Sequence, residues 1–404
     1  MFRKEIHKIL GLNMVYILIL MYTICQYFIL PVFWPMMGIV NMQQKRLDYL
    51  DMVKGIGILL VVLGHMEDIS TELRIWISSF HMPLFFIVSG ILIAVKNEQD
   101  SDFSKILYKK WKGIIVPYLW FSLSYFVIDI ANVTIIGNID TRTFIVDTIS
   151  SLTFYGMSVL WFLPALFVSS VSFIYLKKKL SDKIVLPALL VIAVTAYIIK
   201  IEFAKIYDMN ADSLLITSLI NIVYIFLRAW IAMSYLGYAF YIRKWYEAQV
   251  NGNEKFKTLD NRIFYLLVGI VLLVINIVVG MKNQCVDLRN ILLNNVLLYY
   301  LAAFTGSFAI ISICKAIPKI NIITYFGKNS IIVMACHVNY YILYAGIRFA
   351  WIVDRVITRA KHYVFVAVTV TTVFVLSIIV IEAINRIFPF VIGKPFTLIK
   401  RKQQ

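Results

Sequence analysis

The sequence predicts an all-α protein, a polytopic transmembrane helical bundle of ten core helices with one further apolar run near its N-terminus. Apolar residues make up 61% of the 404 residues and charged residues only 15%, whereas soluble domains are closer to half apolar and a quarter charged. The mean hydropathy of +0.82 agrees with this composition. The chain also contains repeated apolar runs of roughly 17–25 residues, which is the length of a membrane-spanning helix. Lipid is therefore the expected solvent for most of the chain.

The ten expected core helices follow one another with short polar connections and no segment long enough for a separate soluble domain. The first is the least obvious, because its strongly apolar part covers only residues 56–66. The expected helices lie near residues 52–72, 75–95, 113–132, 158–176, 184–201, 214–241, 262–281, 290–314, 322–347 and 363–388.

An additional apolar run at 13–40 precedes the core. It is open to three interpretations: an eleventh spanning helix, a cleaved leader, or a segment upstream of a true start at Met42. We therefore divide the chain into an N-terminal extension (1–41), a membrane domain (42–390) and a basic tail (391–404).

The net charge of +17 does not indicate nucleic-acid binding, because the basic residues lie in short loops between apolar runs, as the positive-inside rule distributes them. The more basic set of alternate loops and the tail are expected on the cytoplasmic side. The loop at 348–362 is an exception, because its four basic residues fall on the opposite side, and a spanning run at 13–40 would invert the pattern. The four cysteines lack the spacing of a disulfide framework or a metal site, and no metal is expected.

Three of the five histidines, His65, His81 and His337, fall within apolar runs. Ionisable groups inside a membrane are costly and are functional candidates by default. The alternative for each is a hydrogen bond between helices.

Lys54 and His65 form the most specific pair. Eleven residues at 100° per residue place both side chains on one helix face, about 16 Å apart along the axis. A long ligand with an anionic head and a reactive tip fits this spacing, and acyl-CoA is such a ligand. The alternative for Lys54 is an interfacial lysine that extends toward lipid headgroups.

His81 should lie at the depth of His65 across a short hairpin. Pro83 opens the helix locally, and Ser89 and Gly90 allow another helix or a ligand to approach closely. Asp68, three residues after His65, is positioned to orient the imidazole if the helix continues. Its alternative role is a solvated residue at the helix end.

Several other residues carry weaker signals. Lys109 and Lys112 belong to a cytoplasmic basic cluster that suits either headgroups or phosphate. Lys328, Asn329 and Ser330 open a helix whose N–H groups can receive phosphate. Arg228 needs either a structural ion pair or a substrate, and Glu382 is expected to pair with Arg386.

Several segments of the sequence resemble the acyltransferase-3 family of membrane O-acyltransferases. They are 46–51 (RLDYLD), 54–56 (KGI), 61–65 (VVLGH), 80–90 (FHMPLFFIVSG), 160–167 (LWFLPALF) and 325–330 (YFGKNS) with His337. Many members have Arg where this chain has Lys54. A branch similar to fucose-4-O-acetylase has Lys at that position, as this chain does. The resemblance covers residues 45–388.

The resemblance implies a bacterial plasma-membrane enzyme that takes acetyl-CoA as co-substrate, without a permanently bound cofactor, and has a cytoplasmic C-terminus. His65 would be catalytic, as general base or as transient acyl carrier, and Lys54 would meet the acyl donor. His81, Ser89 and Trp161, with His337 and Arg228, would line the cavity for a sugar, exopolysaccharide, capsule or lipid-linked glycan acceptor. Trp161 could instead be an interfacial belt residue.

Two other classes of function stay open at this point. A transporter or flippase for the same kind of glycan would also use polar residues and broken helices near the midplane. A glycan polymerase would favour large outer loops rich in Arg and Asp, whereas the longest outer loop expected here, 133–157, has Arg142 as its basic residue. The sequence does not predict the acceptor, the acyl group or the oligomeric state.

Overall fold

The computed structural model describes residues 47–137, 139–209, 214–252, 261–356 and 362–395. Within these ranges 84% of the chain is helical and no β-strand forms. The all-α prediction is therefore confirmed. The apolar run at 13–40, the start at Met42 and most of the tail lie outside the described residues.

The helices follow in this order: α3 (Asp48–Gly64), α4 (Thr71–Ser78), α5 (His81–Val95), α6 (Phe103–Lys110), α7 (Val116–Ala131), α8 (Thr141–Leu152), α9 (Phe162–Lys179), α10 (Asp182–Met209), α11 (Leu214–Gly252), α13 (Arg262–Asn283), α14 (Val296–Ala316), α15 (Asn321–Lys328), α16 (Ser330–Cys336), α17 (Ile342–Val356) and α18 (His362–Arg386). A π-helical turn at Trp111–Ile115 joins α6 to α7, and a 3-10 turn at Ser158–Trp161 leads into α9.

Eight helical segments of the described chain are long and apolar enough to cross a membrane, which makes this a membrane protein. They correspond to eight of the ten expected helices. These segments are Thr71–Val95, Phe103–Ile136, Ser158–Lys179, Asp182–Phe203, Ser218–Gly252, Arg262–Asn283, Val296–Ala316 and Tyr363–Arg386.

The structure differs from the prediction at the other two expected helices, the first and the ninth. The first is a helix of only 17 residues, α3, which ends at Gly64, so residues 66–72 do not continue it. The ninth, expected at 322–347, is wrong as a single helix: the chain forms α15, α16 and α17 with breaks at Asn329 and after Cys336. Tyr341 has a φ of +58°, in the left-handed region that stops a right-handed helix.

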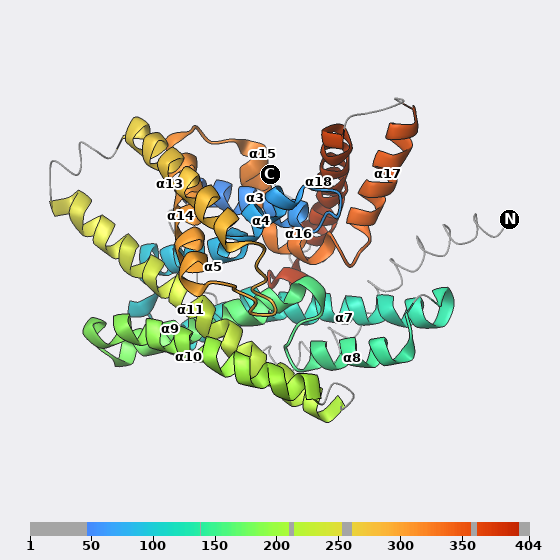
Figure 1. Ribbon diagram of the computed structural model, residues 1–404, viewed down its shortest axis with the longest axis horizontal. Coiled ribbons are helices and arrows are strands. Elements are labelled where there is room, and N and C mark those ends of the chain that lie inside the picture. Colours follow the sequence, from blue (N-terminus) through green and yellow to red (C-terminus); the bar gives the residue numbers. More distant parts are fainter. Residues whose placement is uncertain (1–46, 138, 210–213, 253–260, 357–361, 396–404) are drawn as a thin grey trace, which may run out of the picture.

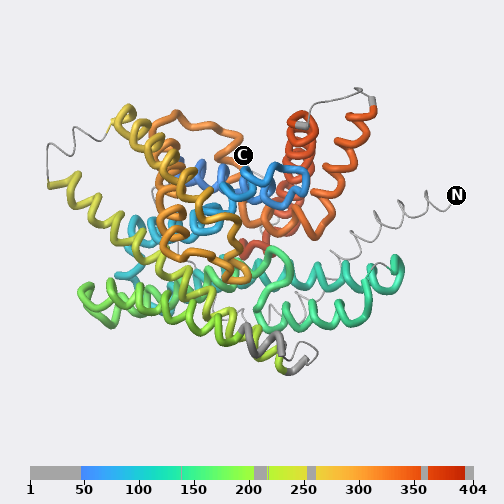
Figure 2. The backbone as a smooth tube through the Cα atoms, viewed as in Figure 1, coloured from blue at the N-terminus to red at the C-terminus, as the bar shows by residue number. Residues whose placement is uncertain are grey.

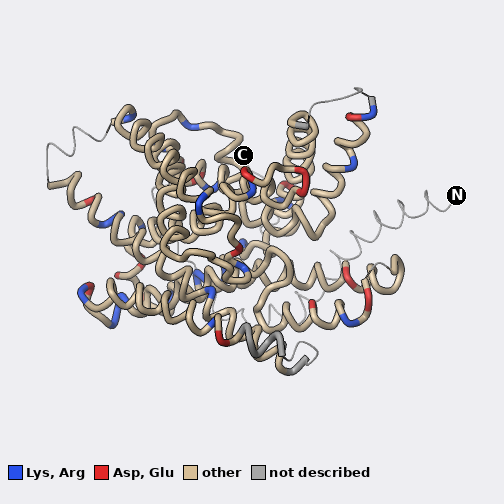
Figure 3. The backbone as a smooth tube through the Cα atoms, in the orientation of Figure 1, with Lys and Arg blue, Asp and Glu red and all other residues tan. Residues whose placement is uncertain are grey.

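In Figure 1, α3 and α5 lie near the centre of the bundle, with α13 and α14 on one side and α17 and α18 on the other. The tube in Figure 2 shows α11 crossing the bundle on its way from α10 to α13. Lys, Arg, Asp and Glu occur mainly at helix ends and in loops, while the long helices are largely without charge (Figure 3). The charged residues therefore concentrate where the spanning helices begin and end.

Polar side chains cap the helices where the sequence leaves the apolar runs. Ser70 accepts a hydrogen bond from the Leu73 N–H at the start of α4, and Asn261 and Asn295 do the same at the starts of α13 and α14. Such caps satisfy N–H groups that have no partner within the helix. Pro83 lies in the first turn of α5, where its missing N–H is tolerated.

Glycines allow α3 and α5 to approach their neighbours closely. A Cβ atom at Gly55 would overlap the Ile323 carbonyl oxygen of α15, and one at Gly327 would overlap the Asp51 carbonyl oxygen of α3. Likewise, a Cβ at Gly90 would overlap the Leu236 carbonyl of α11, which confirms the close helix approach expected at that position. Small residues serve this purpose in membrane bundles, where packing drives association.

We expect Gly327→Ala to destabilise the protein by about 1–3 kcal/mol, because backbone atoms of α3 occupy the space that its methyl group needs. Thermal unfolding of the purified protein in detergent measures the change. The control is Gly113→Ala, since a Cβ at Gly113 meets nothing within 4 Å. Equal melting temperatures for the two variants would contradict the close α3–α15 contact.

Candidate functional site

The two candidate residues of the first helix lie at opposite ends of one face of α3. Lys54 is in its second turn and His65 caps its C-terminal end, so the predicted spacing of about 16 Å applies. The face between them is packed rather than open. Ile58 and Val61 are almost fully buried, and the ring of Phe85 on α5 lies against Gly57.

His65 lies beside His337, with the ring centroids 4.9 Å apart and the planes nearly perpendicular. The Nε2 atom of His337 is 3.4 Å from the Nδ1 atom of His65. His65 is exposed, whereas His337 is completely buried. The structure thus pairs two histidines that are 272 residues apart in the sequence.

All three histidines of the predicted apolar runs bind a backbone carbonyl of their own segment through Nδ1. His65 Nδ1 lies 2.8 Å from the Val61 oxygen, and His81 Nδ1 lies 2.8 Å from the Ile77 oxygen. His337 Nδ1 has two such oxygens, of Val333 and Met334. His65 is close enough to His81 to act on it electrostatically, so the two histidines lie at the same end of the bundle.

A tight loop at 284–295 brings charge to this end. Asp287 and Leu292 form a short antiparallel bridge, and Asp287 also accepts hydrogen bonds from the Arg289 N–H and the Asn290 amide. Both Asp287 and Arg289 are close enough to His65 to act on it electrostatically. This loop also delays the start of α14 to Val296, six residues later than expected. Sequence reasoning counted Arg289 only as a loop charge and did not single out Asp287.

Asp68 does not share the face of His65. Because α3 ends at Gly64, residue 68 is beyond the helix, and the i+3 geometry assumed from the sequence is wrong. The structure gives no hydrogen bond between these two described residues. Arg74 takes part in this turn instead, donating to the carbonyl oxygens of Met66 and Glu67.

Arg228 is 1% exposed on α11 and binds carbonyl groups rather than a carboxylate. Its Nε donates to the Arg289 oxygen at 2.6 Å, and its Nη1 to the Tyr155 oxygen at 2.9 Å. The guanidinium carbon lies 4.0 Å from the Tyr155 ring centroid and 5.5 Å from that of Trp161. The structural ion pair considered for Arg228 is therefore replaced by two carbonyls and cation–π contacts.

Trp161 is buried at the end of the Ser158–Trp161 turn, so it is not an interfacial belt residue. It belongs to the group of aromatic side chains around Arg228. Ser89 lies eight residues along α5 from His81, about 12 Å away, and therefore is not beside the paired histidines.

Lysines gather at the opposite end of α3 and α5. Glu98, in the connection after α5, has a buried side chain and accepts Lys109 Nζ at 2.8 Å and Lys110 Nζ at 2.9 Å. Burial alone would raise the pKa of Glu98, but the charges of Lys110 and Lys109 outweigh it and lower the pKa. The pKa of Lys96 is lowered by burial and by the charge of Lys109.

Lys54 is electrostatically close to Lys96, and it forms an ion pair with the buried Asp51 at 2.7 Å. Lys54 is therefore part of the same cationic region, but a carboxylate already pairs with it. Lys109 keeps half of its side chain exposed while it binds Glu98. These lysines can meet an anionic group that approaches this end of the bundle.

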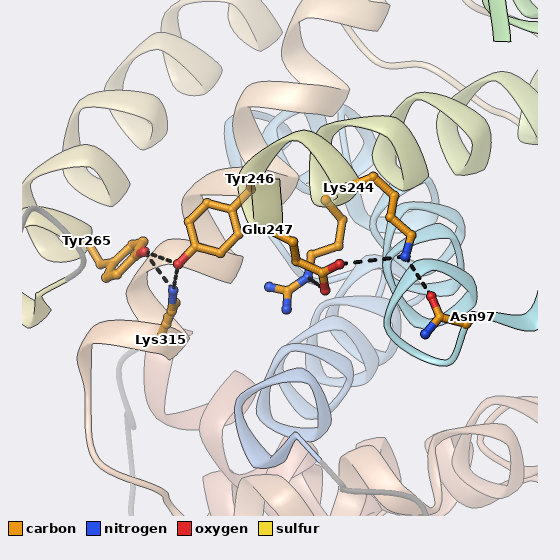
Figure 4. Close-up of polar contacts among 7 residues, drawn as sticks. Asn97, Lys244, Tyr246, Glu247, Tyr265 and Lys315 are labelled. Carbon is orange, nitrogen blue, oxygen red and sulfur yellow. Dashed lines mark hydrogen bonds and ion pairs between the residues drawn. The ribbon is translucent and has the colours of Figure 1, made fainter. Parts of the chain in front are cut away.

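The C-terminal part of α11 contacts the connection that follows α5. Lys244 donates to Asn97, the residue before Glu98, and lies 3.7 Å from Glu247. Figure 4 shows this contact together with Lys315, which binds the hydroxyls of Tyr246 and Tyr265 at 2.6 Å each.

The remaining candidates lie in the π-helical turn before α7 and around the junction of α15 and α16. Lys112 is in the π-helical turn, and its carbonyl packs against Gly393. Lys328 ends α15 and is exposed, while Ser330 begins α16, a helix of only seven residues. The Asn329 side chain donates to the Tyr325 oxygen and accepts from Asn385. Its backbone N–H, one of those expected to receive phosphate, already donates to the Phe326 oxygen.

Nearby, Glu382 pairs with Arg386 at 2.7 Å, as expected from their spacing. Glu382 also accepts a hydrogen bond from the Tyr325 hydroxyl. This contact links α18 to α15.

Comparison with known families gives one finding: the acyltransferase-3 family model, described as an acyltransferase domain, matches residues 47–381. The match spans most of the chain and includes both ends of α3, the loop at 284–295 and His337. No curated protein and no solved structure gives a significant match. An acyltransferase domain in a chain with eight candidate spans defines a membrane-embedded transferase of acyl groups.

We expect Glu98→Gln to lower the melting temperature, because it leaves Lys109 and Lys110 without their shared carboxylate. When folding lowers the pKa of a carboxyl group, that group stabilises the protein at pH values above its pKa in the unfolded chain. The stabilisation disappears as the pH falls through the pKa of the group in the folded protein. The difference in melting temperature between wild type and variant should therefore be largest above about pH 5. It should shrink as the pH falls below the ordinary pKa range of Glu.

Melting temperatures measured across pH 3–7 test this, with the exposed Glu72→Gln as the matched control. A Glu98→Gln difference that grows on acidification would contradict the assignment.

Proposed function

The chain belongs to the acyltransferase-3 family, and from this premise we propose that it is an O-acetyltransferase of the bacterial plasma membrane. It moves an acetyl group from acetyl-CoA to a hydroxyl of a sugar, exopolysaccharide, capsule or lipid-linked glycan. The single observation that carries this proposal is the exposed His65, held through Nδ1 so that Nε2 points away from its carbonyl partner. An imidazole in this state can act as a base.

The acyl donor binds at the lysine-rich end of α3. Its phosphates meet Lys54, Lys109 and Lys112, with Lys328 at the adjoining end of α15. Asn329 and Ser330 complete this side. The half-exposed side chain of Lys109 supports the proposal, because its ammonium group can exchange part of its contact with Glu98 for a phosphate. The packed face of α3 implies that Phe85 moves when the pantetheine arm passes toward His65.

In the proposed reaction, His65 Nε2 takes the proton of the acceptor hydroxyl, and the hydroxyl oxygen attacks the thioester carbon. The C–S bond breaks, the acetyl group stays on the acceptor oxygen, and the coenzyme thiolate receives the proton from the His65 imidazolium. His81, at the same end, serves as the second base or hydrogen-bond partner. Trp161 and Arg228 bound the acceptor side, and Ser89 lies along α5 toward the donor.

A covalent route is the alternative for the same residue. His65 Nε2 would attack the thioester, release the coenzyme thiol and pass the acetyl group to the acceptor. Rapid quenching followed by mass spectrometry of the His65 peptide distinguishes the two routes, because only the covalent route gives an acetylated peptide in the absence of acceptor.

The second candidate function is transport of a glycan or of a lipid-linked precursor. The broken ninth helix favours it, because discontinuous helices near the midplane are typical of transporters. Movement of a fluorescent glycolipid across proteoliposomes without acetyl-CoA would support transport. Acyl transfer in detergent, where there are no compartments, would support the enzyme.

We expect His65→Ala to lower acetyl transfer by at least about 10²-fold, the lower end of a general base's contribution. The measurement is incorporation of labelled acetyl from acetyl-CoA by purified protein into glycans extracted from the envelope of the source cell. His362→Ala is the control, since this histidine begins α18 and the proposed mechanism assigns it no role. A His65→Ala rate equal to that of the wild type would remove His65 from the mechanism.

A further inference from the structure

We propose that His337 is a positioning residue that holds His65 in the tautomer whose Nε2 is unprotonated. This inference rests on the proposed function, because it concerns the base of that reaction. It changes the role of His337 from a contact with the acceptor to a partner of His65. Complete burial of His337 supports the change, since its ring is not exposed to an incoming sugar.

The hydrogen bonds of His337 determine its own tautomer. Its Nδ1 lies 2.8 Å from the Met334 oxygen and 3.0 Å from the Val333 oxygen. Carbonyl oxygens only accept hydrogen bonds, so the proton of the neutral ring must be on Nδ1. The Nε2 atom of His337 is therefore an acceptor, and it points at His65.

The same argument then applies to His65. Its Nδ1 faces two acceptors, the Val61 oxygen at 2.8 Å and the His337 Nε2 at 3.4 Å. A bare Nδ1 would place three lone pairs against each other, so Nδ1 carries the proton and Nε2 does not. The Val61 carbonyl alone would favour this tautomer, and His337 adds a second acceptor that also fixes the ring plane.

The break in the ninth helix places His337 beside His65. The chain leaves α16 at Cys336 and turns through 337–341, where the Leu343 N–H closes onto the His337 oxygen at 2.8 Å. Tyr125 on α7 binds the Ala335 oxygen, and Tyr341 donates to Asn132 at 3.0 Å. These anchors hold the turn, so the His337 ring has little freedom to move.

His81 lacks this arrangement. Its Nδ1 binds Ile77, but among the described residues no second acceptor faces that atom. The structure therefore distinguishes two otherwise similar histidines and assigns the oriented base to His65. When His65 takes up a proton, its Nδ1–H becomes a charged donor, and the bond to His337 strengthens. The buried, neutral imidazole of His337 thus orients His65 as the carboxylate orients the histidine of a catalytic triad.

The test compares His337→Gln with His337→Leu. The Gln side chain can place an amide oxygen where His337 has Nε2, whereas Leu fills the space without an acceptor. We expect Leu to lower kcat by about tenfold or more, the loss of one hydrogen bond in the charged state, with the KM for acetyl-CoA unchanged. Gln should recover most of the rate.

A second readout does not depend on acyl transfer. Diethyl pyrocarbonate acylates an unprotonated imidazole nitrogen, and peptide mass spectrometry reports the rate at His65 separately from the other histidines. We expect a slower rate at His65 in His337→Leu, recovery in His337→Gln and an unchanged rate at His81. This readout still decides the role of His337 if the wild type shows no acetyl transfer, an outcome that would count against the proposed function only.

Melting temperatures show whether each variant is folded. If His337→Leu does not fold, His337→Met provides a second side chain without a strong acceptor. Equal losses of kcat in the Gln and Leu variants, or a His65 modification rate that stays at the wild-type value in the Leu variant, would overturn the proposal.

Discussion

The structure depends on the close approach of α3 to α15. Backbone meets backbone where Gly55 faces Ile323 and Gly327 faces Asp51, and a side chain larger than hydrogen at either glycine would separate the two helices. This contact places the Lys54 end of α3 beside the end of α15, and α16 continues from there toward His337. The pairing of His65 with His337 follows from it, because a short α3 brings its last residue level with the break in the ninth helix.

Charge is distributed so that buried ions have partners of different kinds. Glu98 is compensated by two lysines, and Lys54 by Asp51. Arg228 instead uses carbonyl oxygens and aromatic rings, which hold a guanidinium without a counter-ion. By binding the Arg289 and Tyr155 oxygens, Arg228 joins the loop at 284–295 to the turn before α9. Arg228 therefore holds in place the loop whose Asp287 and Arg289 approach His65.

The broken ninth helix brings His337 beside His65. Irregular backbone at membrane depth is tolerated only where it is buried in protein or lines a cavity. Here the Tyr341 N–H donates to the Val338 oxygen and the Leu343 N–H to the His337 oxygen. Tyr125 of α7 binds the Ala335 oxygen just before the turn, and the turn begins with the buried His337.

The sequence by itself determined the membrane class, eight of the spanning segments, the Lys54–His65 face and the Glu382–Arg386 pair, because these depend on composition or on helical periodicity within one segment. Only the tertiary structure decided that α3 ends before Asp68, that His337 is the partner of His65, and that Arg289 and Asp287 approach the same site. These relations join residues far apart in the chain. They are set by glycine contacts and helix breaks, whose positions depend on the packing of neighbouring helices rather than on local sequence.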